Sequence, residues 1–243
     1  YNGEYCSLSG TSMATPYLAG CCALVNEYLK ESGSDLQGAE KNQYIKNLLM
    51  NSAKLYKDDN GLYITPRRQG AGFVSLSNLL DDKVILTGDS GEAKIELYDK
   101  INDSFDMNVN IKNISGDTVK FKNAELVLTT DDVGNSEEGT VISGAVALDC
   151  TADLSSLKTI GAGESLTENI HVELDPSQLE EIASVFTNGF FIDGYILLSG
   201  AKNCCDISIP LTGFRGDWTK VPIFDENMFS ENSVLGSNFA GTY

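Results

Sequence analysis

The sequence predicts a helical segment followed by an all-β sandwich. In residues 1–82 apolar side chains recur every three or four positions, which is typical of helices with one buried face. From residue 83 onward apolar and polar residues alternate in short runs separated by turn residues, as in strands. The charge divides in the same way, because only nine of the 35 acidic residues lie in residues 1–82. We therefore expect two parts with different surfaces.

The first part is expected to contain two long helices, Pro16–Lys30 and Ala39–Tyr56. Pro16 falls in the first turn, where its missing N–H is tolerated. The first helix carries an apolar stripe made of Leu18, Cys22, Val25 and Leu29. Small residues beside this stripe allow close packing against a neighbour, so we expect a buried helix with Ser12 at its N-terminus.

The second part is expected to form an antiparallel sandwich of seven or eight short strands. The predicted strands are Lys83–Thr87, Lys94–Tyr98, Phe105–Lys112, Ala124–Thr129, Val141–Leu148, Leu166–Leu174, Phe190–Leu198 and Asp206–Thr212. Residues Pro176–Phe186 instead have helical spacing. We place the sandwich at residues 83–222, and residues 223–243 read as a polar linker or the start of a further module.

The stretch Ser9–Pro16, SGTSMATP, contains the candidate catalytic residue Ser12. A helix N-terminus offers free N–H groups and partial positive charge to an oxyanion formed beside such a serine. A serine becomes nucleophilic only when a base removes its proton. The one histidine, His171, sits in the alternating segment IHVEL, where a packing or surface role is expected. In isolation, the serines and threonines of the stretch would be ordinary capping residues.

The longer pattern changes that interpretation. Tyr5, Leu8–Pro16 and Ala19-Gly20 together resemble the serine-bearing signature of the subtilisin-like serine proteases, the subtilases. Leu48–Ala53 and Gly70–Val74 resemble the family's next helix and its G-x-G-x-V turn. The resemblance implies an incomplete α/β, subtilisin-like segment over residues 1–82, with Ser12 as nucleophile and its own N–H as an oxyanion donor. The family's Asp, His and oxyanion Asn would all precede residue 1, so we expect this chain alone to be inactive.

Residues 188–218 resemble the end of the first fibronectin type III-like domain of cell-envelope subtilases, which include lactocepin-type and streptococcal complement-anaphylatoxin peptidases. The resemblance implies a secreted serine endopeptidase on a Gram-positive cell wall or surface, acting on protein or peptide substrates. The alternative is a non-catalytic surface adhesion or spacer protein that keeps a degenerate protease segment. The upstream coding sequence distinguishes the two: an Asp, a His and an Asn within the family's own motifs there would favour the protease.

The composition excludes some partners. A net charge of −18 argues against binding to nucleic acid or to an anionic membrane. No apolar run is long enough to span a bilayer, and residues 1–8 do not form a signal peptide. An apolar stripe exposed to water would favour self-association of the fragment.

No cofactor is expected, although calcium is possible in the parent enzyme. Asp58–Gly61 and the acidic pairs Asp131-Asp132 and Glu137-Glu138 offer oxygen ligands, but they read as solvated turns. The six cysteines include two adjacent pairs, Cys21-Cys22 and Cys204-Cys205, whose spacing does not match that of common zinc sites. We interpret all six as thiols or packing residues.

Overall fold

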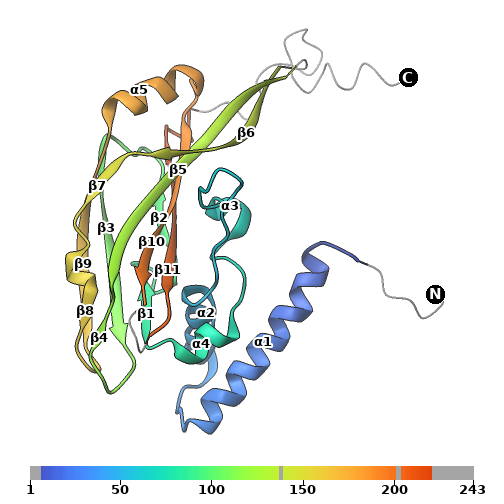
Figure 1. Cartoon of the computed structure of the whole chain (residues 1–243), viewed down its shortest axis with the longest axis vertical. Helices are drawn as coiled ribbons and strands as arrows, with labels where there is room; N and C mark the ends of the chain where they lie inside the picture. The colour runs from blue at the N-terminus through green and yellow to red at the C-terminus, as the bar shows by residue number, and fades with distance from the viewer. Residues whose placement is uncertain (1–6, 137–138, 201–203, 221–243) are drawn as a thin grey trace, which may run out of the picture.

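A computed structural model describes residues 7–136, 139–200 and 204–220 of the chain. The described chain is a mixed α/β structure with helices first and sheets after them (Figure 1). The expected linker 223–243, Cys6 and the pair Glu137-Glu138 lie outside the described residues.

Four helices form the first part: α1 (Thr11–Glu31), α2 (Gly38–Asn51), α3 (Pro66–Gln69) and α4 (Leu76–Asp81). The predicted helix Pro16–Lys30 therefore starts five residues earlier, which places Ser12 inside the first turn of α1. The predicted helix Ala39–Tyr56 ends at Asn51, because the following chain turns away and Lys54 pairs with Phe73. In the described part of residues 1–82 this pairing and the bridge Lys57–Tyr63 are the only β contacts.

The second part has two main sheets. One has the strand order β1-β3-β9-β7, formed by Val84–Thr87, Ser104–Asn113, Ser165–Leu174 and Cys150–Ala152. The other has the order β2-β11-β10-β5-β6, formed by Ile95–Tyr98, Ile207–Arg215, Phe190–Ser199, Asn123–Ser136 and Gly139–Leu148. The short strands β4 (Val119–Lys120) and β8 (Thr159–Ile160) form a separate pair.

The two main sheets share one hydrophobic core. Alternation along β3 and β9 buries Val109, Ile111, Ile170 and Val172. On β10 and β11 most residues are buried, because helices α2 and α3 contact this sheet from the other side. Helix α5 (Pro176–Val185) adds Leu179 to the core and is capped by Asp175, whose carboxylate accepts from two backbone N–H groups. The layered arrangement is visible in Figure 1.

The expectation of a wholly antiparallel sandwich is wrong at one strand. Strand β2 pairs with β11 in parallel, whereas the other strand pairs are antiparallel. The chain leaves β1 in one sheet, turns at Gly88–Gly91 and enters β2 in the other. Alternation of side chains reports which face of a strand is buried but not the direction of its neighbour, so the sequence pattern cannot reveal this pairing.

Candidate active site

Ser12 is the second residue of α1, after the N-cap residue Gly10. Its side chain is exposed, and within the described residues its hydroxyl has no hydrogen-bond partner. The first N–H groups of a helix have no partner inside the helix, so the N–H of Ser12 is available at the same end. Met13 N and Ala14 N, by contrast, both donate to Gly10 O. The Ser12 hydroxyl and an oxyanion donor thus lie together at an open helix terminus.

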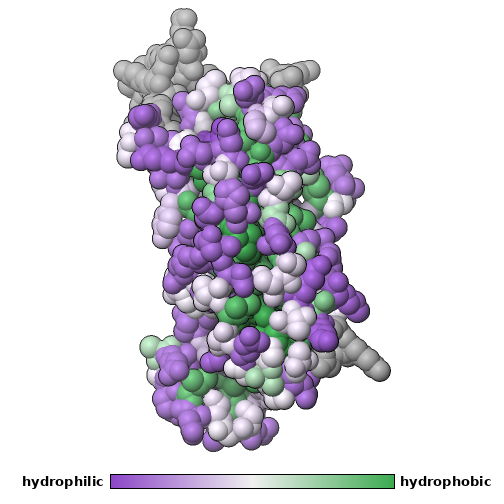
Figure 2. Space-filling view, turned by 90° about the vertical axis from the view of Figure 1, so that its left-hand side faces the viewer, coloured by the Kyte–Doolittle hydropathy of each residue, from purple (hydrophilic) through white to green (hydrophobic). Residues whose placement is uncertain are grey.

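His171 lies in another part of the molecule. It is an exposed residue on β9, and its Nδ1 is 2.9 Å from Asp106 Oδ1 on the paired strand β3. Strand β9 is on the opposite side of the molecule from α1 (Figure 1), and that side is mainly hydrophilic (Figure 2). The structure therefore does not bring His171 to Ser12.

Helix α1 is far more exposed than the sequence suggested. Only Cys21, Val25 and Leu29 are buried, and Leu18 of the expected stripe is 44% exposed. The helix projects from the body of the protein with its N-terminal end free (Figure 1). Four large apolar residues that flank this stripe, at three- and four-residue spacing, are also exposed: Met13, Tyr17, Leu24 and Tyr28. The apolar face of α1 is therefore wider than the stripe that the described residues bury.

The three motif segments of the first part meet around α1. Residues from α1, α2, α4 and β1 form a small second core: Cys21, Val25, Leu29, Ile45, Leu48, Leu49, Leu79 and Ile85. The turn Gly70–Val74 contacts α1 through Phe73, whose ring centroid is 5.8 Å from that of Tyr17. Gly72 has a φ of +113°, and a Cβ there would lie 2.6 Å from Lys54 O. The glycine is therefore required by both its backbone conformation and the closeness of the neighbouring chain.

Asn51, at the end of α2, connects the helical part to both sheets. Its side chain is fully buried. Its Nδ2 donates to Ser208 O of β11 over 2.9 Å, and its Oδ1 accepts from Leu86 N of β1, also over 2.9 Å. The motif Leu48–Ala53 indicated only that Asn51 belongs to a helix. The available signal was an amide directly after the apolar run Leu48-Leu49-Met50.

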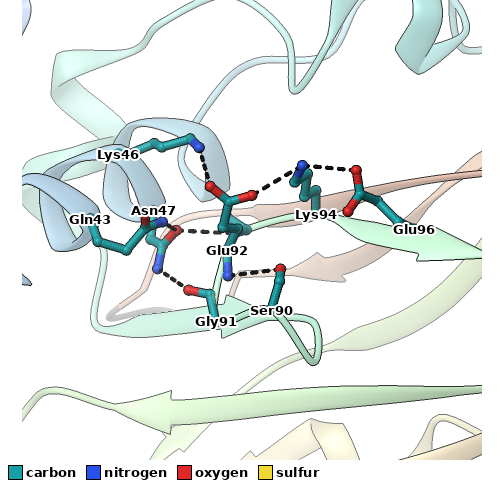
Figure 3. A network of polar contacts seen from close by, with 9 residues as sticks. Gln43, Lys46, Asn47, Ser90, Gly91, Glu92, Lys94 and Glu96 are labelled. Carbon is teal, nitrogen blue, oxygen red and sulfur yellow. Dashed lines mark hydrogen bonds and ion pairs between the residues drawn. The ribbon is translucent and has the colours of Figure 1, made fainter.

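Asn47, one turn earlier on α2, connects the helix to the segment between β1 and β2. Its Nδ2 donates to Gly91 O, and its Oδ1 accepts from Ala93 N (Figure 3). Lys46 forms an ion pair with Glu92, which also pairs with Lys94 (Figure 3). Hydrogen bonds from Lys46 and then Lys94 lower the pKa of Glu92. Both contacts hold α2 against the second part.

A second connection runs through Arg67 of α3. Its Nε donates to Asp193 Oδ2 over 2.7 Å, and one terminal nitrogen donates to both carboxylate oxygens of Asp131. Asp193 is fully buried, and Thr212 Oγ1 donates to its other oxygen. Burial raises the pKa of Asp193 against the effect of these hydrogen bonds. The sequence signal was an acid inside the apolar strand FFIDGYI.

The expectation that Asp131 and Asp132 lie in a solvated turn is wrong, because both belong to strand β5 and Asp131 pairs with Arg67. Asp58 Oδ1 accepts from Asn60 N and Leu62 N, so this carboxylate closes its own turn. Five of the six cysteines are described, and all five are free thiols. Cys204 and Cys205 lie beside Asp82, with one ligand atom of each residue within 4.8 Å of the others. Burial raises the pKa of Asp82 to about 8, and a hydrogen bond from Cys205 lowers the pKa of Cys204.

Comparison with known proteins agrees with the motifs. Residues 1–72 match the family model Peptidase_S8, the Subtilase family. We refer to residues 1–72, after the family that they match, as the subtilase segment. This segment contains Ser12, the stretch Leu48–Ala53 at the end of α2 and the first residues of the glycine turn.

The similarity extends past the subtilase segment to nearly the whole chain. A C5a peptidase of Streptococcus pyogenes serotype M1 is 30% identical over 243 residues, covering 98% of this chain and 20% of the relative. A PI-type proteinase of Lactococcus lactis subsp. cremoris is 25% identical over 256 residues, covering 98% of this chain and 13% of the relative. The chain thus spans a fifth or less of the length of these relatives. None of the helices in the described part of the chain combines the length and apolar character needed to cross a bilayer.

Proposed function

We propose that residues 1–243 contribute the nucleophile of a subtilisin-like serine endopeptidase, and that Ser12 is this nucleophile. The observation that carries the proposal is the intact SGTSMATP stretch, with the Ser12 hydroxyl unpartnered at the open N-terminus of α1. The match of residues 1–72 to the Subtilase family supports it.

In the proposed reaction Ser12 Oγ attacks the carbonyl carbon of a peptide bond while a base takes the hydroxyl proton. The oxyanion accepts a hydrogen bond from Ser12 N. Collapse of the intermediate breaks the C–N bond, the base returns the proton to the leaving amine, and water then hydrolyses the acyl-enzyme. Since His171 lies beside Asp106 on β3, away from Ser12, we place the base and a second oxyanion donor outside these 243 residues, as the resemblance to subtilases implies.

The same proposal covers the domain organisation. Residues 1–82 form the end of a catalytic domain, residues 83–222 a fibronectin type III-like domain, and residues 223–243 a linker or the start of a further module. Two sheets around one core support the middle assignment. The contacts of Asn51 and Arg67 support direct packing between the first two parts.

The relatives support the proposed substrate and location. Both are named as peptidases or proteinases, and they come from Gram-positive bacteria. We place this chain in an extracellular, cell-surface enzyme of such a bacterium, acting on proteins or peptides.

Substitution of Ser12 in the longer protein that contains this chain tests the proposal. Ser12→Ala is expected to lower kcat by several orders of magnitude, because only substrate binding and oxyanion stabilisation remain. Ser7→Ala, an exposed serine ahead of α1, is the matched control and should leave kcat nearly unchanged. A Ser12→Ala variant that keeps more than about a tenth of wild-type kcat would exclude Ser12 as nucleophile. Absence of any hydrolysis by the wild-type protein would favour the adhesion or spacer alternative.

A further inference from the structure

Asp82, Cys204 and Cys205 come together where the helical part meets the sheets. Asp82 is the C-cap residue of α4 and immediately precedes the connection to β1. Cys204 and Cys205 lie just ahead of β11. The three side chains are far apart in the sequence, and each supplies one ligand atom within 4.8 Å of the other two. Asp82 and Cys204 are only 8% and 7% exposed.

The carboxylate of Asp82 is only half satisfied. Its Oδ1 accepts from Val84 N over 3.0 Å. Its Oδ2 is buried and has no hydrogen-bond partner among the described residues. A buried carboxylate oxygen without a partner is costly, and most such atoms in proteins are paired with a protein group, water or an ion. The unpaired oxygen therefore points to a missing partner beside the two sulfurs.

We propose that Asp82, Cys204 and Cys205 bind a thiophilic divalent cation, and that Zn²⁺ fits this donor set best. Two thiolates and one carboxylate oxygen are ligands that Zn²⁺ accepts, whereas Ca²⁺ and Mg²⁺ select oxygen ligands alone. Adjacent cysteines differ from the usual spacing of zinc sites, but the chain ahead of β11 places both Sγ atoms near one carboxylate. Three protein ligands leave a fourth position for water.

Binding has a defined proton balance and a defined structural effect. Each thiol that becomes a thiolate releases one proton, and Asp82 releases one more if it is protonated beforehand. No bond is oxidised or reduced. The cation would join the end of α4 to the start of β11, next to the connection that Asn51 makes to Ser208 on β11 and Leu86 on β1. It would therefore stabilise the junction between the two parts.

The test is titration of the reduced, chelator-treated full chain with Co²⁺ and with Zn²⁺. Co²⁺ is expected to bind at one equivalent, with a sulfur-to-cobalt charge-transfer band that Zn²⁺ abolishes. The double variant Cys204→Ser/Cys205→Ser should lose the band, and Asp82→Asn should weaken binding at least tenfold. The matched control is Cys21→Ser/Cys22→Ser, the other adjacent pair, which belongs to no such ligand group among the described residues. This control should keep both band and stoichiometry.

A second measurement requires no variant. Zn²⁺ should slow alkylation of Cys204 and Cys205 in the wild-type chain, read by mass spectrometry, while the rate at Cys150 stays unchanged. Failure of the reduced wild-type chain to bind either metal would overturn the proposal. So would a charge-transfer band that survives in the Cys204→Ser/Cys205→Ser variant, or equal protection of Cys150.

Discussion

Helices α1 and α2 belong to the same subtilase segment, but their surroundings differ. Helix α2 contacts the sheets through Asn47 and Asn51, which bond to backbone groups of the second part. Helix α1 has one buried stripe, and the flank of this stripe exposes Met13, Tyr17, Leu24 and Tyr28. The difference shows that α2 is held by contacts to the sheets. In the described part of the chain, the apolar flank of α1 and its Ser12 end stay exposed.

Asn51→Ala should produce the largest loss of stability. It removes two hydrogen bonds and leaves Ser208 O and Leu86 N buried without this partner. We expect about 3 kcal/mol lower free energy of unfolding, from roughly 1–3 kcal/mol for each unpaired group. Asn26→Ala is the matched control. Asn26 is a half-buried residue of α1, and its substitution should change the free energy of unfolding little. Chemical denaturation measures both, and equal losses would contradict the contrast between the helices.

Arg67→Ala should produce the second-largest loss of stability. It leaves the fully buried Asp193 without its cation, but Asp193 keeps the bond from Thr212, and the Arg67 side chain is itself 31% exposed. We therefore expect the free energy of unfolding to fall by about 2 kcal/mol, which is less than the loss on breaking a fully buried ion pair. The neighbouring exposed Arg68→Ala is the control. If thermal unfolding places the two variants at the same midpoint, Arg67 does not anchor α3.

Glu92→Gln should have a smaller, pH-dependent effect. Because Lys46 and Lys94 lower the pKa of Glu92, its ion pairs stabilise the folded state above the carboxylate's unfolded pKa. This contribution is lost as the pH falls through the lowered pKa. The melting temperature of the variant should therefore be lower than that of the wild type at pH 7. In strong acid the two melting temperatures should be equal. Glu96→Gln, which removes only a contact to Lys94, is the control. A difference that persists in strong acid would rule out this electrostatic origin.

Leu24→Lys, on the exposed side of α1, should leave stability within about 0.5 kcal/mol of wild type. It should instead reduce self-association, which we propose for the isolated chain because the apolar side of α1 faces water. Light scattering over a range of concentrations measures this. A wild-type chain that stays monomeric at high concentration would contradict the proposed association.

Sequence reasoning located the long elements, because long strands and helices repeat their apolar pattern over many residues. It missed β4, β7 and β8, which have two or three residues each and no readable period. It also missed the roles of Asn51 and Arg67. Asn51 bonds to Ser208 and Arg67 to Asp193, and each partner is more than a hundred residues away in the chain. At the candidate site, the motif identified Ser12. For the first helix, periodicity indicated an apolar stripe that could face water, but it does not report which residues of the stripe this chain covers.

Reaction with a fluorophosphonate probe tests most directly whether Ser12 depends on groups outside this chain. The probe labels only serines whose proton is removed by a base. We expect no labelling of the isolated 243-residue chain. In the longer protein we expect one label per chain, at Ser12, and none in the Ser12→Ala variant, which serves as the blank. Stoichiometric labelling of Ser12 in the isolated chain would show that its base lies within these residues, and would contradict the account.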